Sequence, residues 1–217
     1  MSVMKLSIRE KLGFGAGDMA VNIVMITMQL IIAFFYTDIY GLDPVDMGIL
    51  FMVVRLFDAF SDPVMGIITD TCHSKHGHFR PFMFWFAIPF GVAVYLAFFT
   101  PDVAYVYKLA WAYFSYILLT LIFTIVTIPY ISLIGVITDD PAERLSANGY
   151  RFVLVKVAAF LVTIVVPELA LYLGDGNMRD GYHPAMGLMG ILGCVVFLVC
   201  FLTTNVVIIT VIDTSKL

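Results

Sequence analysis

The chain has 217 residues, of which 61% are hydrophobic and only 13% are charged, and its formal net charge is −4. A soluble domain of this length carries roughly twice that fraction of charged residues, because its surface faces water. The composition therefore excludes an ordinary soluble enzyme and a disordered chain. The 12 basic residues against 16 acidic ones also exclude a nucleic-acid-binding protein, which needs an excess of positive charge.

Long apolar stretches indicate a polytopic membrane protein, because a helix needs about 20 apolar residues to cross a bilayer. Six candidate spans lie at residues 12–36, 45–69, 82–99, 105–137, 150–173 and 184–212. Four of them have a proline in their interior, at Pro63, Pro89, Pro129 and Pro167, where we expect local breaks. Because the connections are short, the pattern predicts an all-α fold, with residues 1–217 forming a single bundle of six transmembrane helices.

The basic residues of the connections gather on one side of the predicted bundle. The opposite side has only Lys108 and Arg179. Because cytoplasmic connections are rich in Lys and Arg, we expect a multi-pass protein of the cell membrane with both termini in the cytoplasm. The first span follows a polar start without a cleavable signal peptide, so it is expected to act as its own targeting signal. The basic residues in question are Lys5, Arg9, Lys11, Lys75, Arg80, Arg144 and Lys216.

Several polar and ionisable residues lie inside the predicted spans. An ionisable group near the bilayer centre is unfavourable by about 2.5–3.5 kcal/mol, and is tolerated when it is paired, faces water or has a function. The residues concerned are Asp18, Asn22, Arg55, Asp58, Asp62, Arg151 and Lys156.

The second span holds the most informative group. The spacing of Arg55, Asp58 and Asp62 places all three on one helical face. Two carboxylates one turn apart repel each other unless a cation lies between them, and one arginine cannot neutralise both. Na⁺ would take oxygen ligands, whereas a proton would neutralise one acid. A purely internal ion-pair network is the alternative interpretation.

Two features near this pair could add ligands. Pro63 leaves a backbone carbonyl of the span without its helical partner. Thr124 and Thr127 lie in the fourth span. Threonines inside membrane helices usually donate to their own backbone. Opposite a carboxylate pair, however, their hydroxyls could bind the same cation.

Other motifs are assigned to structure. The glycines of residues 13–17 and of residues 187–193 predict close helix packing rather than nucleotide binding. Cys72 with His73, His76 and His78 is interpreted as a polar loop rather than a metal site. The charged residues at 139–144 are interpreted as a solvated turn. No set of residues suggests catalysis, so the protein is not expected to be an enzyme.

Several ordered motifs resemble a known family. They are IREKLGFGAGD at residues 8–18, FYTD at 35–38, LFMVVRLFDAFSDPVMG at 50–66, GHFRPF at 77–82 and IPY at 128–130. In these places the chain resembles the glycoside–pentoside–hexuronide:cation symporters, the melibiose carrier family. The resemblance extends to about residue 204. It implies one six-helix half, the N-terminal one, of a twelve-helix major-facilitator fold that works by alternating access.

The resemblance also implies roles for individual residues. Asp58 and Asp62 would bind the coupling cation with help from Thr124, while Asp18 and Arg151 would bind the sugar. We also place Thr127 in both sites, and Asn22 and Phe123 in the sugar site. Arg55, Asp70 and Arg80 are assigned to ion pairs or gating. No cofactor or metal is expected beyond the coupling Na⁺ or H⁺.

The chain departs from the family pattern in two respects. Thr127 replaces an aspartate of melibiose carriers, Gly17 a lysine and Ile131 a sugar-stacking tryptophan, so the sugar could be a pentoside, glucuronide or other glycoside. The expected length is about twice that of this chain, and residues 205–217 form an atypical tail. The chain is therefore expected to be either a truncated, non-transporting fragment or a half-transporter that needs a partner or forms a homodimer.

Overall fold

The computed structural model describes residues 6–71, 80–138 and 140–203, with only the backbone described at residues 80 and 134–137. The first rod joins α1 (Ile8–Ile26), a π-helical segment (Thr27–Ile31), α2 (Ile32–Phe34) and a second π-helical segment (Phe35–Ile39). The next three rods are α3 (Pro44–Thr71), α4 (Arg80–Ala97) and α5 (Tyr105–Ile137). The fifth joins α6 (Pro141–Phe160), a π-helical segment (Leu161–Val165) and α7 (Val166–Leu173), and α8 (Met178–Thr203) is the sixth.

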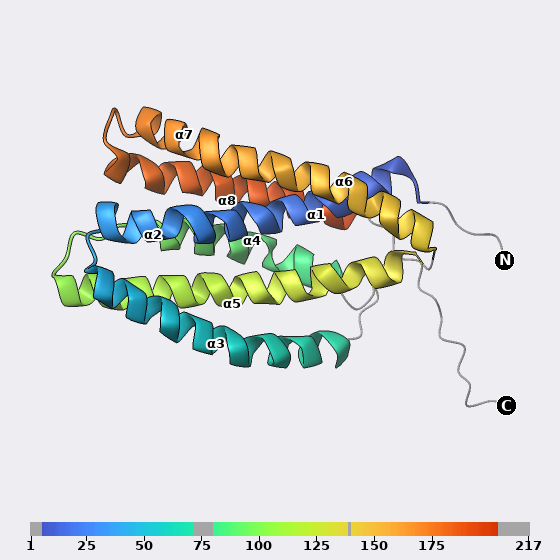
Figure 1. The fold of residues 1–217 in the computed structure, drawn as a ribbon, viewed down its shortest axis with the longest axis horizontal. Helices are drawn as coiled ribbons and strands as arrows, with labels where there is room; N and C mark the ends of the chain where they lie inside the picture. Colours follow the sequence, from blue (N-terminus) through green and yellow to red (C-terminus); the bar gives the residue numbers. More distant parts are fainter. Residues whose placement is uncertain (1–5, 72–79, 139, 204–217) are drawn as a thin grey trace.

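These six rods form one all-helical bundle, which confirms the predicted fold class (Figure 1). Four are long and apolar enough to cross a membrane, at residues 8–39, 105–133, 141–173 and 178–203. The helix α4 is shorter, with 18 residues, and α3 has 28 residues but carries Arg55, Asp58 and Asp62 in its interior. The predicted tail lies outside the described residues.

The bundle has two distinct ends. The connections at residues 40–43, 98–104 and 174–177 lie together at one end, here called the distal end (Figure 1). The start of α1 and the end of α8 lie at the opposite end, here called the terminal end. Each rod runs antiparallel to the next one in the chain (Figure 1).

Two helices, α6 and α8, begin well before the start that the apolar pattern predicts. The predicted fifth span starts at residue 150, but α6 starts at Pro141, because Asp140 accepts a hydrogen bond from the Ala142 N–H and so caps the helix. The predicted sixth span starts at residue 184, whereas α8 starts at Met178. Both added segments are polar, and apolar length alone therefore missed them.

The predicted breaks at proline are wrong in three of four cases. The helices α3, α4 and α5 continue through Pro63, Pro89 and Pro129. Near Pro167 the rod widens into the π-helical segment Leu161–Val165, which accommodates the missing N–H locally. Proline in these helices therefore changes hydrogen bonding without ending the helix.

Glycines bring the helices close together, as the sequence predicts. A Cβ atom at Gly15 would lie 3.1 Å from the Arg151 Cα atom, so α1 nearly touches the backbone of α6. A Cβ atom at Gly190 would lie 2.8 Å from the Gly91 carbonyl oxygen, so α8 and α4 are equally close. As a result α1 packs between α6 and α8, and α4 packs between α5 and α8, while α3 packs mainly on α5.

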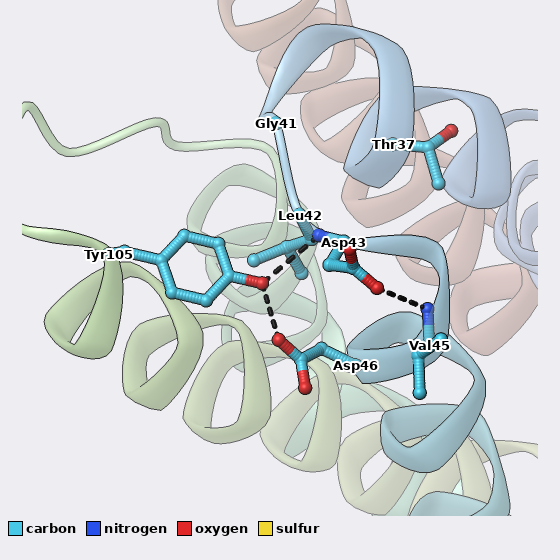
Figure 2. A pocket seen from close by; sticks show the side chains of 7 residues that line it. All are labelled: Thr37, Gly41, Leu42, Asp43, Val45, Asp46 and Tyr105. Atoms are coloured by element: carbon cyan, nitrogen blue, oxygen red, sulfur yellow. Dashed lines mark hydrogen bonds between the residues drawn. The ribbon is translucent and has the colours of Figure 1, made fainter.

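A tyrosine fastens α3 to α5 at the distal end (Figure 2). The Tyr105 hydroxyl accepts a hydrogen bond from the Asp43 N–H at 3.0 Å and donates one to the Asp46 carboxylate. The Asp43 carboxylate accepts from the Val45 N–H at 2.8 Å, which caps α3. The neighbouring Tyr40 hydroxyl donates to the Lys108 carbonyl at 2.9 Å. Burial raises the pKa of Tyr40 to about 12, so this donor keeps its proton at neutral pH.

Candidate functional site

An ion pair joins α1 to α6 inside the bundle. The Arg151 Nε atom lies 3.1 Å from the Asp18 Oδ2 atom, and Asp18 is only 8% exposed. The close approach at Gly15, one turn before Asp18, brings the two helices near enough for this contact. The pair therefore compensates a buried carboxylate while the arginine side chain keeps about a quarter of its surface exposed.

The surroundings of Asp18 are closely packed. The Tyr130 hydroxyl donates to the Phe14 carbonyl at 2.8 Å, which fixes α5 against α1. A Cβ atom at Gly17 would lie 2.5 Å from the Tyr130 ring. The Asn22 side-chain amide donates to the Asp18 carbonyl at 2.9 Å, so that amide is partly engaged by its own helix.

One member of the predicted carboxylate pair, Asp62, contacts α5. The Thr124 hydroxyl donates to the Asp62 Oδ1 atom at 2.9 Å, across the α3–α5 interface. The hydroxyl thus bonds a carboxylate on another helix rather than its own backbone. Two carboxylates with a hydroxyl supply the oxygen ligands that a hard cation requires.

The second carboxylate of the pair is poorly compensated. The Arg55 Nη1 atom lies 3.8 Å from the Asp58 Oδ2 atom, and the Arg55 side chain is 79% exposed. The other Asp58 oxygen, Oδ1, is buried without a hydrogen-bond partner. A carboxylate oxygen that is removed from water and left unpaired strongly favours a cation or a proton.

Two further predicted residues lie on α5. The Thr127 hydroxyl is buried and has no hydrogen-bond partner. It follows Thr124 by one helical turn and so lies on nearly the same face. Phe123 is partly buried and packs against the apolar core.

The structure does not join the remaining predicted residues into one site. Among the described residues no hydrogen bond or ion pair joins the Asp18–Arg151 pair to the Asp58–Asp62 pair. Asp70 is exposed near the end of α3, and the Arg80 side chain is outside the described part, so their predicted gating role is not tested. The Cys72–His78 segment also lies outside the described residues. Within the described ranges no cluster of three metal-binding side chains occurs.

One polar cluster was not predicted from the sequence. The Lys11 Nζ atom on α1 lies 2.8 Å from the Glu143 Oε2 atom on α6, and these side chains are only 11% and 14% exposed. Lys11 also donates to the Ser146 hydroxyl at 2.9 Å, and Glu143 accepts from the Leu6 N–H at 3.2 Å. The predicted solvated turn is therefore wrong at Glu143, which is half-buried and paired. Nothing in the spacing of Lys11 and Glu143 indicates that they meet.

The distal hollow of about 740 Å³ is a separate feature, formed around Tyr105 (Figure 2). Its Asp43 and Asp46 carboxylates already accept hydrogen bonds from the protein. It does not connect through any described contact with the predicted site residues.

Comparison with known proteins places the chain in a family. Residues 13–209 match the family described as MFS/sugar transport protein. The chain belongs to the MFS/sugar transport protein family. It is 42% identical over 201 residues to the putative glycoside/cation symporter YagG of Escherichia coli K12, covering 93% of this chain and 44% of the relative.

Other members of the MFS/sugar transport protein family agree with this assignment. The inner membrane symporter YicJ of Escherichia coli K12 is 40% identical over 200 residues, covering 92% of this chain and 44% of the relative. The isoprimeverose transporter of Lactiplantibacillus pentosus is 31% identical over 198 residues, covering 90% of this chain and 41% of the relative. The chain therefore spans less than half the length of these relatives.

The family match confirms several predictions. The resemblance to the glycoside–pentoside–hexuronide:cation symporters is correct, and the chain belongs to a family of transporters rather than of enzymes, as expected. The chain is a multi-pass membrane protein of the MFS/sugar transport protein family, and it matches less than half of each of these symporters.

Proposed function

We propose that this chain is the N-terminal, six-helix half of a symporter that couples Na⁺ or H⁺ to the movement of a glycoside, pentoside or hexuronide. The observation that carries the proposal is the environment of the acid pair. Asp62 accepts a hydrogen bond from Thr124, and Asp58 keeps one buried oxygen without a partner. The coupling cation would bind there, with Thr127 as a further hydroxyl ligand.

The proposed sugar site is the Asp18–Arg151 pair. A carboxylate and a guanidinium together provide acceptors and donors that match the hydroxyls of a sugar. Arg151 remains partly exposed, so it can bind a ligand while it stays paired. Asn22 and Phe123 would complete the site. The names of two relatives, a putative glycoside/cation symporter and an isoprimeverose transporter, support a sugar derivative as the substrate class.

Exposed charged side chains inside α3 and α6 support the presence of a second six-helix half that covers these faces. Arg55 is 79% exposed, and Asp62 and Lys156 are also exposed, although all three lie well inside their helices. Charged groups at such depth face a water-filled cavity or a protein partner rather than lipid. We propose that these faces of α3 and α6 line the transport cavity, closed by a separate six-helix half or by a second copy of this chain. Both termini would lie in the cytoplasm of a bacterial cell.

Cation binding can be tested on the purified chain without transport. Its thermal unfolding in detergent should shift upward when Na⁺ replaces choline, or when pH falls if H⁺ is the coupling ion. Asp58→Asn and Asp62→Asn should remove this shift. Gly66→Ala is the matched control on the same helix, because a Cβ atom there meets nothing within 4 Å. An unaltered cation response in both acid variants would overturn the proposed site.

Transport should be measured in proteoliposomes that contain only this chain. Labelled galactoside, xyloside and glucuronide would be offered with and without an inward Na⁺ or H⁺ gradient, with Asp58→Asn alongside. Gradient-driven uptake that the variant loses would show a working homodimer. Cation binding without uptake would show a half that needs a partner, and absence of both would support the truncated fragment.

A further inference from the structure

An apolar groove runs along the bundle between α4 and α8 and reaches the end of α7. It encloses about 590 Å³, a volume within the usual range of small-molecule sites. Its walls include Val92 and Tyr95 of α4 and Leu188 and Ile191 of α8. These side chains are between 45% and 62% exposed, so the groove opens outward from the bundle.

Glycines shape the floor of this groove. The backbones of α4 and α8 meet at Gly91 and Gly190, as described above. A Cβ atom at Gly187 would lie 3.0 Å from the Tyr95 ring, so the absence of a side chain there leaves a notch beside that ring. A Cβ atom at Gly193 would lie 3.1 Å from the Phe90 ring. All three glycines of this stretch of α8 therefore already face α4.

This arrangement disfavours a second helix as the occupant. Membrane helices associate through small residues that let their backbones approach closely. Here Gly187, Gly190 and Gly193 contact α4, and the outward rim consists of larger side chains such as Leu188 and Ile191. A lipid hydrocarbon chain is thinner and more flexible than a helix, so it can enter this narrow apolar notch on a membrane-spanning bundle.

The position of the groove matches one leaflet. On α8 its lining extends from Pro184 to Cys194, about 15 Å at the rise of an α-helix, or half of the roughly 30 Å hydrocarbon core. Tyr95 lies toward the distal end, where its ring packs against His183 at 4.0 Å between centroids. Aromatic side chains of this kind gather at the level of the lipid headgroups.

We propose that this groove holds one acyl chain of a zwitterionic bilayer phospholipid, with its headgroup at the distal end. The exposed residues there carry both signs, with Asp175 and Asp180 beside Arg179. A headgroup with an ammonium and a phosphate matches this mixture, whereas an anionic headgroup would meet an excess of carboxylates. The site is independent of the proposed transport function.

The test compares substitutions at two valines whose side chains are equally exposed. Val92 lines the groove and Val195 does not, and both side chains are 50% exposed. Val92→Trp should fill the groove, while Val195→Trp should leave it open. The chain would be purified from phosphatidylethanolamine–phosphatidylglycerol vesicles, washed in detergent and examined by native mass spectrometry, with thermal unfolding as a check of folding.

The proposal expects the unaltered chain and Val195→Trp to retain one phosphatidylethanolamine, and Val92→Trp to lose at least half of it. Equal retention by all three proteins would overturn the site, because the lipid would then be bound over the surface generally. Retention of phosphatidylglycerol alone would overturn the assigned headgroup. A dimer that Val92→Trp alone dissociates would identify a second copy of the chain as the occupant and also overturn the proposal. If Val92→Trp unfolds, Leu188→Trp provides the same test from the other wall.

Discussion

At the scale of single residues, the strongest feature is one hydroxyl that reaches across two helices. Thr124 bonds Asp62 directly, so the α5 side chain helps to set the position of a carboxylate on α3. A cation that binds Asp62 would find both oxygens already close together. This preorganisation would lower the entropy lost on binding.

Removal of that hydroxyl gives a sharp prediction. Thr124→Val keeps the side-chain shape but deletes the donor to Asp62. We expect the cation-induced rise in Tm to require at least about tenfold more cation, since a hydrogen bond to a charged group contributes about 1.5–3 kcal/mol. Thr124→Ser, which keeps the hydroxyl, should retain most of the response. Equal responses of the valine and serine variants would contradict the role of Thr124.

Sequence reasoning reaches part of this site. Helical spacing places Asp58 and Asp62 on one face, and in the structure Asp62 contacts Thr124 of α5. The partner of Asp62 could not be derived from periodicity, because Thr124 lies on another helix and its approach depends on the crossing of α3 and α5. The role of the Asp18–Arg151 pair came from resemblance, and only the structure shows the two side chains in contact.

At the scale of elements, two ion pairs join α1 to α6; α1 supplies the cation in one pair and the anion in the other. Lys11 of α1 pairs with Glu143 of α6, and two turns further Asp18 of α1 pairs with Arg151 of α6. A shift of one helix along the other would separate both pairs. Together they fix the register of the two helices that carry the proposed sugar site.

Breaking the first pair should loosen this register. Lys11→Met removes a cation 2.8 Å from the Glu143 carboxylate, whose side chain is only 14% exposed, and we expect the free energy of unfolding in detergent to fall by about 1–3 kcal/mol. The double variant Lys11→Met with Glu143→Gln should recover part of the loss, because no uncompensated charge remains. A single variant as stable as the parent would contradict this contribution of the Lys11–Glu143 pair.

The contact between α4 and α8 gives a second prediction at this scale. Gly190→Ala places a methyl group 2.8 Å from the Gly91 carbonyl oxygen, so the helices must separate. We expect a clear drop in Tm and a larger aggregated fraction on gel filtration. Gly48→Ala on α3 is the control, because a Cβ atom there has open space and alanine favours helix. Similar Tm values for both variants would contradict the packing role.

Most elements could be predicted from apolar length, but their ends could not. The start of α6 is set by the Asp140 cap and Pro141, which are polar signals outside the apolar stretch. The expected breaks at Pro63, Pro89 and Pro129 did not occur, and α3, α4 and α5 continue through these residues. The π-helical turns of the first rod coincide with threonines that donate to their own backbone, such as Thr27 to Ile23.

At the scale of the whole molecule, the two ends of the bundle should face opposite sides of the membrane. Single cysteines at Ser7 and Ala142 would report the terminal end, and one at Gly176 the distal end, in a cysteine-free background. An impermeant maleimide added to intact cells should label only the distal position. Labelling of the terminal positions from outside would reverse the proposed orientation.

The contact between Gly17 and the Tyr130 ring limits which substitutions the protein can tolerate at position 17. A side chain at position 17 would meet the Tyr130 ring, which is itself held by the Phe14 carbonyl. Gly17→Lys therefore cannot be reached as a single viable step without displacing that ring. A directed-evolution library should vary positions 17 and 130 together, since beneficial pairs would be invisible to one-at-a-time mutagenesis.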